Sequence, residues 1–566
     1  MKRGKHIRKT EKERVNKRTE KKRPRFPAGT RSERQVIPMR GTKHPILRLA
    51  ALAAALLLTA CGGTVQDGGE GEKVINLAFT TAWGDFNPYY TSTGTMYELA
   101  LYDKLYDKLA FTDMAGAEIL PRAAKSWDSG AGGKAIVFHL DENARWSDGE
   151  PVTAADWVFT VRLLADPASA FTTRLFTALL SGTNRDGERL ENHDLGAQAV
   201  NDFTLVLTFK DKINPEDFLL RYNREFLVLP EHLLKDVPPE ELRKAEYWQN
   251  PVGSGPCVYV SQVMGSEMIL APNPYYHLWA GNWDRLILRV VDSSSRLTGL
   301  MSGDIDQIVL GNDITADDIP LAESNGLSVR DAEVRNFFME VCINEANIPR
   351  EKVRQALHYA IDKEAVIAAA AKDVGIPAYS YEMPNSPYYD PGLAFPRDVE
   401  KAKALLKEAN YDGRPYTIAF AAKRENIAAL LTQQWKEAGI NVEMVIVDVA
   451  IMFSGLSSGI YDLGISGHSA SAYSLWFETE FPANNTNATF SSDQTRDSYV
   501  ERISTTVDHA EKVALVKEYQ KYLAEQTWFI PLYFAGEYWV ESHRVSNIRN
   551  SASLMCNDNV WEWYVN

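Results

Sequence analysis

The sequence predicts an α/β fold in which two or three domains follow one another without a linker. A strand, a helix and a second strand are expected at residues 416–421, 427–438 and 441–447, which is the spacing of a βαβ unit. Roughly 490 residues follow the polar, Gly-rich segment 64–72, and this length exceeds a single hydrophobic core. Because no Pro-, Gly- or Ser-rich stretch divides these residues, we expect domains that pack tightly or that are joined by crossing strands.

Hydrophobic periodicity predicts the remaining elements. Alternating or continuous apolar residues predict strands at 73–80, 135–140, 204–209, 266–270, 286–291 and 528–533. Helical spacing predicts helices at 95–110, 349–361, 399–409 and 513–526. Thr153 and Asp156 form a candidate capping box, Asp398 is a candidate helix cap, and Pro349 is expected at a first helical position.

The first 61 residues predict export. The apolar segment 46–60 has a charged entry and a small-residue exit, as a secretory signal does, and is too short to span a bilayer. Residues 58–61 (Leu-Thr-Ala-Cys) resemble a bacterial lipobox. We therefore expect Cys61 to carry a lipid anchor, residues 1–60 to be leader and signal peptide, and residues 61–73 to form a tether. Met39 begins a more ordinary signal, so translation is expected to start there.

Charge and composition limit the classes of function. Residues 1–48 hold 18 Lys and Arg and 4 Asp and Glu, whereas the whole chain has a net charge of −14, so the rest of the chain has a net charge of −28. An acidic body argues against nucleic acid as a partner, because phosphate contacts need clustered Lys and Arg. The cysteines that follow Cys61 are Cys257, Cys342 and Cys556. We expect Cys257 and Cys342 to be buried in strands, without a disulfide.

No motif of catalysis is found. The sequence has no phosphate-binding loop, HExxH, GxSxG or paired CxxC, and no two of its ten His residues stand at helical i,i+4 spacing. We therefore expect no catalytic residue, no metal site and no cofactor.

Six motifs follow one another in a fixed order. They are a strand–turn–helix stretch at 127–164, GSGP at 253–256, NPYY at 273–276, SGDID at 302–306, VRQAL at 353–357 and KAKALL at 401–406. Together they resemble extracellular solute-binding protein family 5, the receptors of oligopeptide, dipeptide and nickel ABC importers. The resemblance covers roughly residues 74–540. These motifs are expected to be mainly structural.

The resemblance implies a two-lobed, periplasmic-binding-protein-like fold with a small extra domain and hinge strands that cross between the lobes. Lobe I is expected at 74–103, 199–330 and 536–566, the small domain at 104–198, and lobe II at 331–535. A ligand would be enclosed by hinge closure, which also explains the missing linker and the missing catalytic motifs.

The resemblance also places two ligand-binding segments. One follows the turn Asn87-Pro88, and the other follows the pair Tyr461-Asp462. The candidate ligand-binding residues are Ser92, Thr93, Gly94, His468, Ser469, Ser471, Tyr473 and Trp476. Peptide-binding members place an acidic residue, which pairs with the peptide ammonium, where this chain has Ser471. Recognition of a free peptide N-terminus is therefore left open, with Glu478 or Glu480 as substitutes.

We expect a receptor that captures an oligopeptide-like solute and delivers it to an ABC permease with its ATPase. The alternatives are a receptor of the same fold for an oligosaccharide or a nickel chelate, and a sensory receptor without transport. The expected protein is a monomer on the extracytoplasmic face of the cell membrane, attached by its lipid alone.

Overall fold

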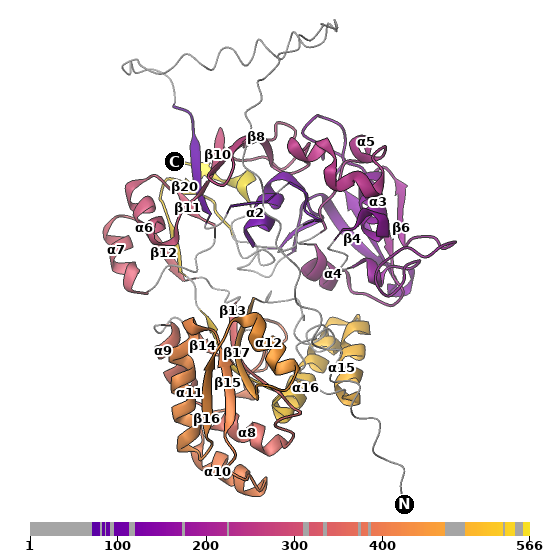
Figure 1. The fold of residues 1–566 in the computed structure, drawn as a ribbon. Coiled ribbons are helices and arrows are strands. Elements are labelled where there is room, and N and C mark those ends of the chain that lie inside the picture. Colours follow the sequence, from indigo (N-terminus) through magenta and orange to yellow (C-terminus); the bar gives the residue numbers. More distant parts are fainter. Residues whose placement is uncertain are drawn as a thin grey trace, which may run out of the picture. The chain divides into compact units, whose positions relative to one another are not determined.

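The structure is a computed structural model, and three main sheets organise it (Figure 1). It describes residues 71–79, 82–84, 86–90, 96–112, 119–171, 176–223, 226–309, 316–331, 337–371, 375–382, 386–469, 493–535, 538–549 and 559–566. Cys61 lies outside these residues. None of the helices in this part of the chain combines the length and the apolar composition that crossing a bilayer requires.

A seven-stranded sheet has the order β12-β19-β11-β1-β10-β9-β8. Its strands are β1 (Val74–Phe79), β8 (Cys257–Val263), β9 (Glu267–Pro272), β10 (Arg285–Val290), β11 (Gln307–Ile308), β12 (Ser328–Asp331) and β19 (Tyr538–Glu541). β1 runs parallel to β10 on one side and to β11 on the other. Four of its six side chains are fully buried, as expected for a central parallel strand.

A six-stranded sheet has the order β14-β18-β13-β17-β15-β16. Its strands are β13 (Phe337–Ile343), β14 (Gly375–Pro377), β15 (Tyr416–Phe420), β16 (Val442–Ile446), β17 (Leu463–Ser469) and β18 (Phe529–Ala535). β15 runs parallel to β16 and to β17, which confirms the predicted βαβ unit. β13 runs antiparallel to both of its neighbours, β17 and β18.

A four-stranded antiparallel sheet has the order β4-β5-β7-β6. Its strands are β4 (Ala124–Gly130), β5 (Ala135–Leu140), β6 (Ala197–Asn201) and β7 (Thr204–Thr208), so the expected boundary between 198 and 199 falls inside β6. Two small hairpins complete the strands: β2 (Ala110–Thr112) with β3 (Ile119–Pro121), and β20 (Val545–Ser546) with β21 (Tyr564–Val565).

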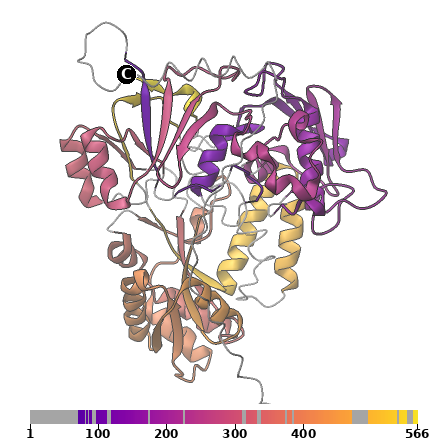
Figure 2. The same ribbon diagram turned by 45° about the horizontal axis from the view of Figure 1, so that its top comes forward.

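Helices connect and cover these sheets. The main ones are α2 (Met96–Leu105), α3 (Ala154–Ala165), α4 (Pro215–Tyr222), α5 (Glu231–Leu234), α6 (Ser293–Ser302), α7 (Ile319–Ser324), α8 (Glu351–Tyr359), α9 (Lys363–Ala371), α10 (Val399–Glu408), α11 (Glu425–Glu437), α12 (Val449–Ser457), α15 (Gln494–Thr505) and α16 (His509–Gln526). α15 and α16 are neighbours (Figure 2).

Local capping chemistry sets several helix starts. The capping box at the start of α3 is confirmed, with Oδ2 of Asp156 accepting from the backbone N–H of Thr153 at 2.8 Å. Asp398 caps α10 by accepting from the N–H of Lys401. The expectation for Pro349 is wrong: α8 begins at Glu351 with Arg350 as its N-cap, so Pro349 precedes the helix and its carbonyl accepts from Arg354 instead.

The family motifs tie distant segments together. Gly253 and Gly255 lie against the carboxyl end of α2, where a Cβ on Gly253 would stand 2.0 Å from the carbonyl oxygen of Leu105. The N–H of Gly255 donates to that same oxygen at 2.9 Å, and Asn273 donates its side-chain amide to the carbonyl of Gly255. These glycines are therefore needed because two backbones meet without room for a side chain.

Two chain crossings connect the two larger sheets. The chain passes from β12 to β13 over residues 332–336, and it returns from β18 to β19 over residues 536–537. Asp331 pairs with Tyr538 at one end of the crossings, and Phe337 pairs with Ala535 at the other. The described residues that flank the two crossings are therefore neighbours at both ends.

Candidate functional site

The first candidate segment follows the carboxyl end of β1. In sheets with parallel strands, ligands bind outside the carboxyl ends of those strands. β1, β10 and β11 are parallel, so Phe79, Val290 and Ile308 mark one such edge. The chain leaves β1 at this edge and reaches the Asn87-Pro88 turn eight residues later. Ser92, Thr93 and Gly94 lie outside the described residues.

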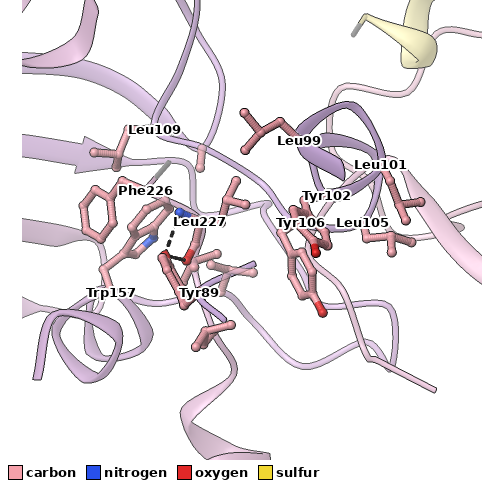
Figure 3. Packing of buried hydrophobic residues seen from close by; sticks show 14 of the residues in the cluster. Tyr89, Leu99, Leu101, Tyr102, Leu105, Tyr106, Leu109, Trp157, Phe226 and Leu227 are labelled. Atoms are coloured by element: carbon pink, nitrogen blue, oxygen red, sulfur yellow. Dashed lines mark hydrogen bonds between the residues drawn. The ribbon is translucent and has the colours of Figure 1, made fainter. Parts of the chain in front are cut away.

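The turn that leads into this segment is firmly attached to its surroundings. Asn87 Oδ1 accepts from the N–H of Tyr89 at 2.9 Å, and the Tyr89 hydroxyl donates to the carbonyl of Leu227 (Figure 3). The hydroxyl of Tyr90 donates to the carbonyl of Ser169 at 2.6 Å. Tyr89 and Tyr90 are both buried. The residues immediately before the candidate segment thus have a fixed position on the hydrophobic core.

The second candidate segment follows the carboxyl end of β17. Phe420 of β15, Ile446 of β16 and Ser469 of β17 end their parallel strands at one edge of the six-stranded sheet. His468 and Ser469 are the last two residues of β17, and their backbones pair with Phe338 and Phe337 of β13. Ser471, Tyr473 and Trp476 lie outside the described residues.

The Asp of the Tyr461-Asp462 pair fixes the start of β17 on β15. Its Oδ2 accepts from the backbone N–H of Thr417 at 2.8 Å and from the hydroxyl of Thr417 at 3.1 Å, and Arg414 donates to its Oδ1 at 3.2 Å. Asp462 is therefore a register-setting residue, because it holds the two strands together at their amino ends.

The far half of β17 has one open side. β15 pairs with β17 only at Leu463 and Gly464, whereas β13 pairs with β17 along its whole length. Beyond Gly464, no described strand faces β17 on the β15 side. Arg424 stands at the beginning of this stretch, where its guanidinium donates to the carbonyl of Ile465 at 2.5 Å. From Gly467 to Ser469, β17 thus has a described neighbouring strand on the β13 side alone.

A buried polar cluster adjoins this edge on β13. Glu340 is fully buried, accepts from the Tyr381 hydroxyl at 3.1 Å and from the Cys342 thiol at 3.3 Å, and pairs in register with Ser466 of β17. Burial lowers the pKa of Arg424 and raises the pKa of Tyr533 to about 12. Arg424 also interacts electrostatically with Tyr533, Cys342 and Glu340, so the cluster contains both a buried cation and a buried carboxylate.

Sequence reasoning missed Arg424, Glu340 and Tyr381. Two signals were present: Arg424 is the third residue after a predicted parallel strand, and Glu340 is the single charged residue of the apolar run FFMEVCI. Tyr381 carried no such signal.

The described residues offer no candidate for a metal centre, since they contain no group of three or more His, Cys, Asp or Glu residues suited to hold an ion.

The expectation for Cys257 and Cys342 is confirmed, because both are buried, free thiols in strands.

Comparison with known proteins identifies the family. The model of the bacterial extracellular solute-binding proteins, family 5 (middle region), matches residues 118–489. Heme-binding protein A of Haemophilus influenzae is 27% identical over 463 residues, which cover 74% of this chain and 80% of the relative. The periplasmic oligopeptide-binding protein OppA of Escherichia coli is 25% identical over 469 residues, which cover 76% of this chain and 81% of the relative.

Solved structures have the same fold. The ABC transporter substrate-binding protein CtaP of Listeria monocytogenes superposes with a TM-score of 0.73 at 23% identity, covering 88% of this chain and 100% of that one. The oligopeptide-binding protein AppA of Bacillus subtilis, solved with a nonapeptide, superposes with a TM-score of 0.67 at 21% identity. The match covers 88% of this chain and 99% of AppA. With these matches, the chain belongs to the bacterial extracellular solute-binding proteins, family 5.

Proposed function

We propose that this chain is the substrate-binding receptor of an ABC importer and that it captures a peptide-like solute between two lobes. One observation carries the proposal: both candidate segments leave their sheets at the carboxyl ends of parallel strands. The hinge crossings end beside the same edge of the six-stranded sheet, where Phe337 pairs with Ser469 and with Ala535. Binding there needs no catalysis, only a higher affinity for ligand in the closed state.

The open side of β17 supports a peptide-like ligand. An extended peptide can add to a sheet edge through main-chain hydrogen bonds, which is the binding mode called β-augmentation. Residues Gly467 to Ser469 continue beyond the end of β15, where the described partner strand is β13 alone. Two relatives are named for oligopeptide binding, and the AppA structure contains a nonapeptide. We assign Ser92, Thr93, Gly94, His468, Ser469, Ser471, Tyr473 and Trp476 to the ligand contacts.

Recognition of the peptide N-terminus is proposed to differ from that of the usual family member. A neutral Ser471 cannot form the charge-assisted hydrogen bond that a carboxylate gives to an ammonium group. We therefore propose that this receptor tolerates a blocked N-terminus, or that Glu478 or Glu480 supplies the missing charge. The two versions differ in the expected affinity for acetylated peptides.

We further propose that Cys61 is lipidated and holds the receptor on the extracytoplasmic face of the cell membrane. Tethering would raise the effective concentration of the receptor near its permease. Within the body, we assign 74–103, 199–330 and 536–566 to lobe I, 104–198 to the small domain and 331–535 to lobe II. The protein is proposed to act as a monomer.

Ligand identification tests the proposal. The full chain would be purified without denaturation, and the small molecules that it carries would be released and identified by mass spectrometry. Thermal shift with peptide mixtures of graded length, each in a free and an N-acetylated form, provides the matched comparison. Peptides that co-purify and raise the melting temperature support the proposal. A consistent non-peptide ligand, such as heme or an oligosaccharide, would overturn its peptide part.

A further inference from the structure

A cavity of about 360 Å³ lies between two parts of the chain. One part is α4 together with residues 209–214, which follow β7, and the other is the helix pair α15–α16. This volume is within the range of small-molecule sites. None of its lining residues belongs to β1, β13 or β17, the strands of the candidate site described above. By the lobe bounds proposed above, residues 209–222 belong to lobe I and residues 500–512 belong to lobe II, so the cavity lies in the space between the two lobes.

The cavity has an apolar interior that the fold supports from behind. Its apolar lining includes Leu179, Phe209, Phe218, Tyr222, Val500 and Ile503. Phe218 is fully buried and packs against Phe209 and Tyr222 with ring centroids 5.5 Å apart in both pairs. Because these rings belong to a larger buried cluster, the apolar wall keeps its shape when the cavity is empty.

Positive charge is in excess at this cavity. Four cationic side chains line it (Lys210, Lys212, Arg221 and Lys512), against two acidic ones (Asp211 and Asp217). Lys512 is already paired with Asp217, and Lys210 donates to the backbone carbonyls of Ala178 and Asn184. Lys212 is exposed. This local excess contrasts with the strongly acidic body and favours an anionic group in the ligand.

Both walls of the cavity are fixed to each other. Asp217 of α4 accepts from Lys512 of α16 and from the Tyr388 hydroxyl at 3.4 Å. Asn214, the N-cap of α4, donates its side-chain amide to the carbonyl of Val507 at 3.2 Å. Lys512 is almost completely buried, so its pairing with Asp217 is largely shielded from solvent. In this structure the cavity thus has two walls that are held together, an apolar interior and cations around it.

We propose that this part of the space between the lobes binds an amphipathic organic anion, which has one carboxylate or sulfonate and an aromatic or aliphatic body; the proposal rests on the lobe assignment of the proposed function. The apolar wall receives the aromatic or aliphatic part of the ligand. Its anionic group is attracted by the cationic side chains of Lys212, Arg221 and Lys210. α15, which forms one wall, is the next described helix after β17, the strand that leads into the second candidate segment.

Two fluorescent probes of the same ring system test the site on the full chain. One is 8-anilinonaphthalene-1-sulfonate, and the other is the uncharged N-phenyl-1-naphthylamine. Ser504 lines the cavity and is exposed, so Ser504→Trp should fill its mouth without disturbing the core. We expect this variant to lose at least about tenfold in affinity for the sulfonate probe. Lys212→Gln should weaken the same probe about two- to fivefold, as expected for an exposed charge.

Lys235→Gln is the matched control, because Lys235 is also exposed but does not line the cavity. Lys235→Gln should leave the affinity of the protein for both probes unchanged. Lys212→Gln should leave the affinity for the uncharged probe unchanged. Far-UV circular dichroism establishes that each variant is folded. If Ser504→Trp bound the sulfonate probe with the same affinity as the wild-type protein, the proposed site would be overturned. Equal affinity of the wild-type protein for the two probes would overturn the anionic class of ligand.

Discussion

The hydroxyl of Tyr381 donates a hydrogen bond of 3.1 Å to Oε2 of Glu340, a carboxylate that is fully buried in the six-stranded sheet. The two residues are 41 positions apart in the chain, and their contact joins the segment before α10 to the central strand β13. Since Glu340 is in register with Ser466, the pair also supports the strand that ends in the second candidate segment.

Loss of this hydrogen bond should destabilise the protein measurably. Tyr381→Phe keeps the ring and its packing but leaves a buried carboxylate with one donor fewer, and this should cost about 1–3 kcal/mol in the free energy of unfolding. Urea denaturation measures it. Tyr499→Phe is the control, because Tyr499 donates to Glu518 at an exposed site, and it should cost less than about 0.5 kcal/mol. Equal losses would contradict a special role for the buried pair.

A side chain at position 255 should not be tolerated. A Cβ there would lie 2.7 Å from the carbonyl carbon of Leu105 and 2.8 Å from the carbonyl oxygen of Lys104, both rigid backbone atoms at the end of α2. Gly255→Ala should therefore lower the free energy of unfolding by about 1–3 kcal/mol or more. Gly130→Ala, whose Cβ would meet its nearest neighbour at 3.4 Å, serves as the control. Thermal melting of the two variants side by side would show whether they differ as expected.

The two buried thiols should be unreactive in the folded protein. Burial raises the pKa of Cys257 to about 12 and holds that of Cys342 well above its usual value. The thiolate is the reactive form, so at about pH 8 almost none is present at either residue. Peptide mapping after iodoacetamide treatment should show labelling more than about a hundredfold slower in the folded than in the urea-unfolded protein. Fast labelling of either residue before unfolding would refute the buried thiol environment.

Lipidation at Cys61 predicts the distribution of the protein between membrane and medium. Cys61→Ser removes the only atom that can carry the thioether-linked lipid at this position. The variant should be released from the membrane fraction and should bind its ligand as the parent does, because residues of the body form the proposed site. Fractionation followed by immunodetection measures the distribution. Retention of the variant on the membrane would show that Cys61 is not the anchor.

The sequence allowed local features of the fold to be predicted better than long-range ones. The βαβ unit and the caps at Thr153 and Asp398 depend on residues close in the chain, so periodicity and side-chain chemistry were sufficient. Pro349 was placed two residues too far into α8, because Pro is tolerated in the turn before a helix as well as within its first turn.

Features of the site that depend on distant pairs could not be predicted. The open side of β17 exists because β15 ends at Phe420 while β13 continues, and pairing of this kind is not encoded in either strand alone. The contact between Asp217 and Lys512 spans 295 positions, and both residues look like ordinary surface charges in the sequence. The two candidate segments were found only through a resemblance between motifs, which indicates position along the chain and not geometry.

Hydrogen–deuterium exchange of the full chain, with and without a saturating mixture of random tetrapeptides, tests the proposed function most directly. We expect the peptides to slow exchange in residues 91–95 and in residues 465–476, since main-chain hydrogen bonds to the ligand would protect both segments together. Residues 204–208, in the four-stranded sheet, should exchange equally in both samples. Peptide binding that leaves both segments unprotected, or that protects other residues instead, would contradict the central claim.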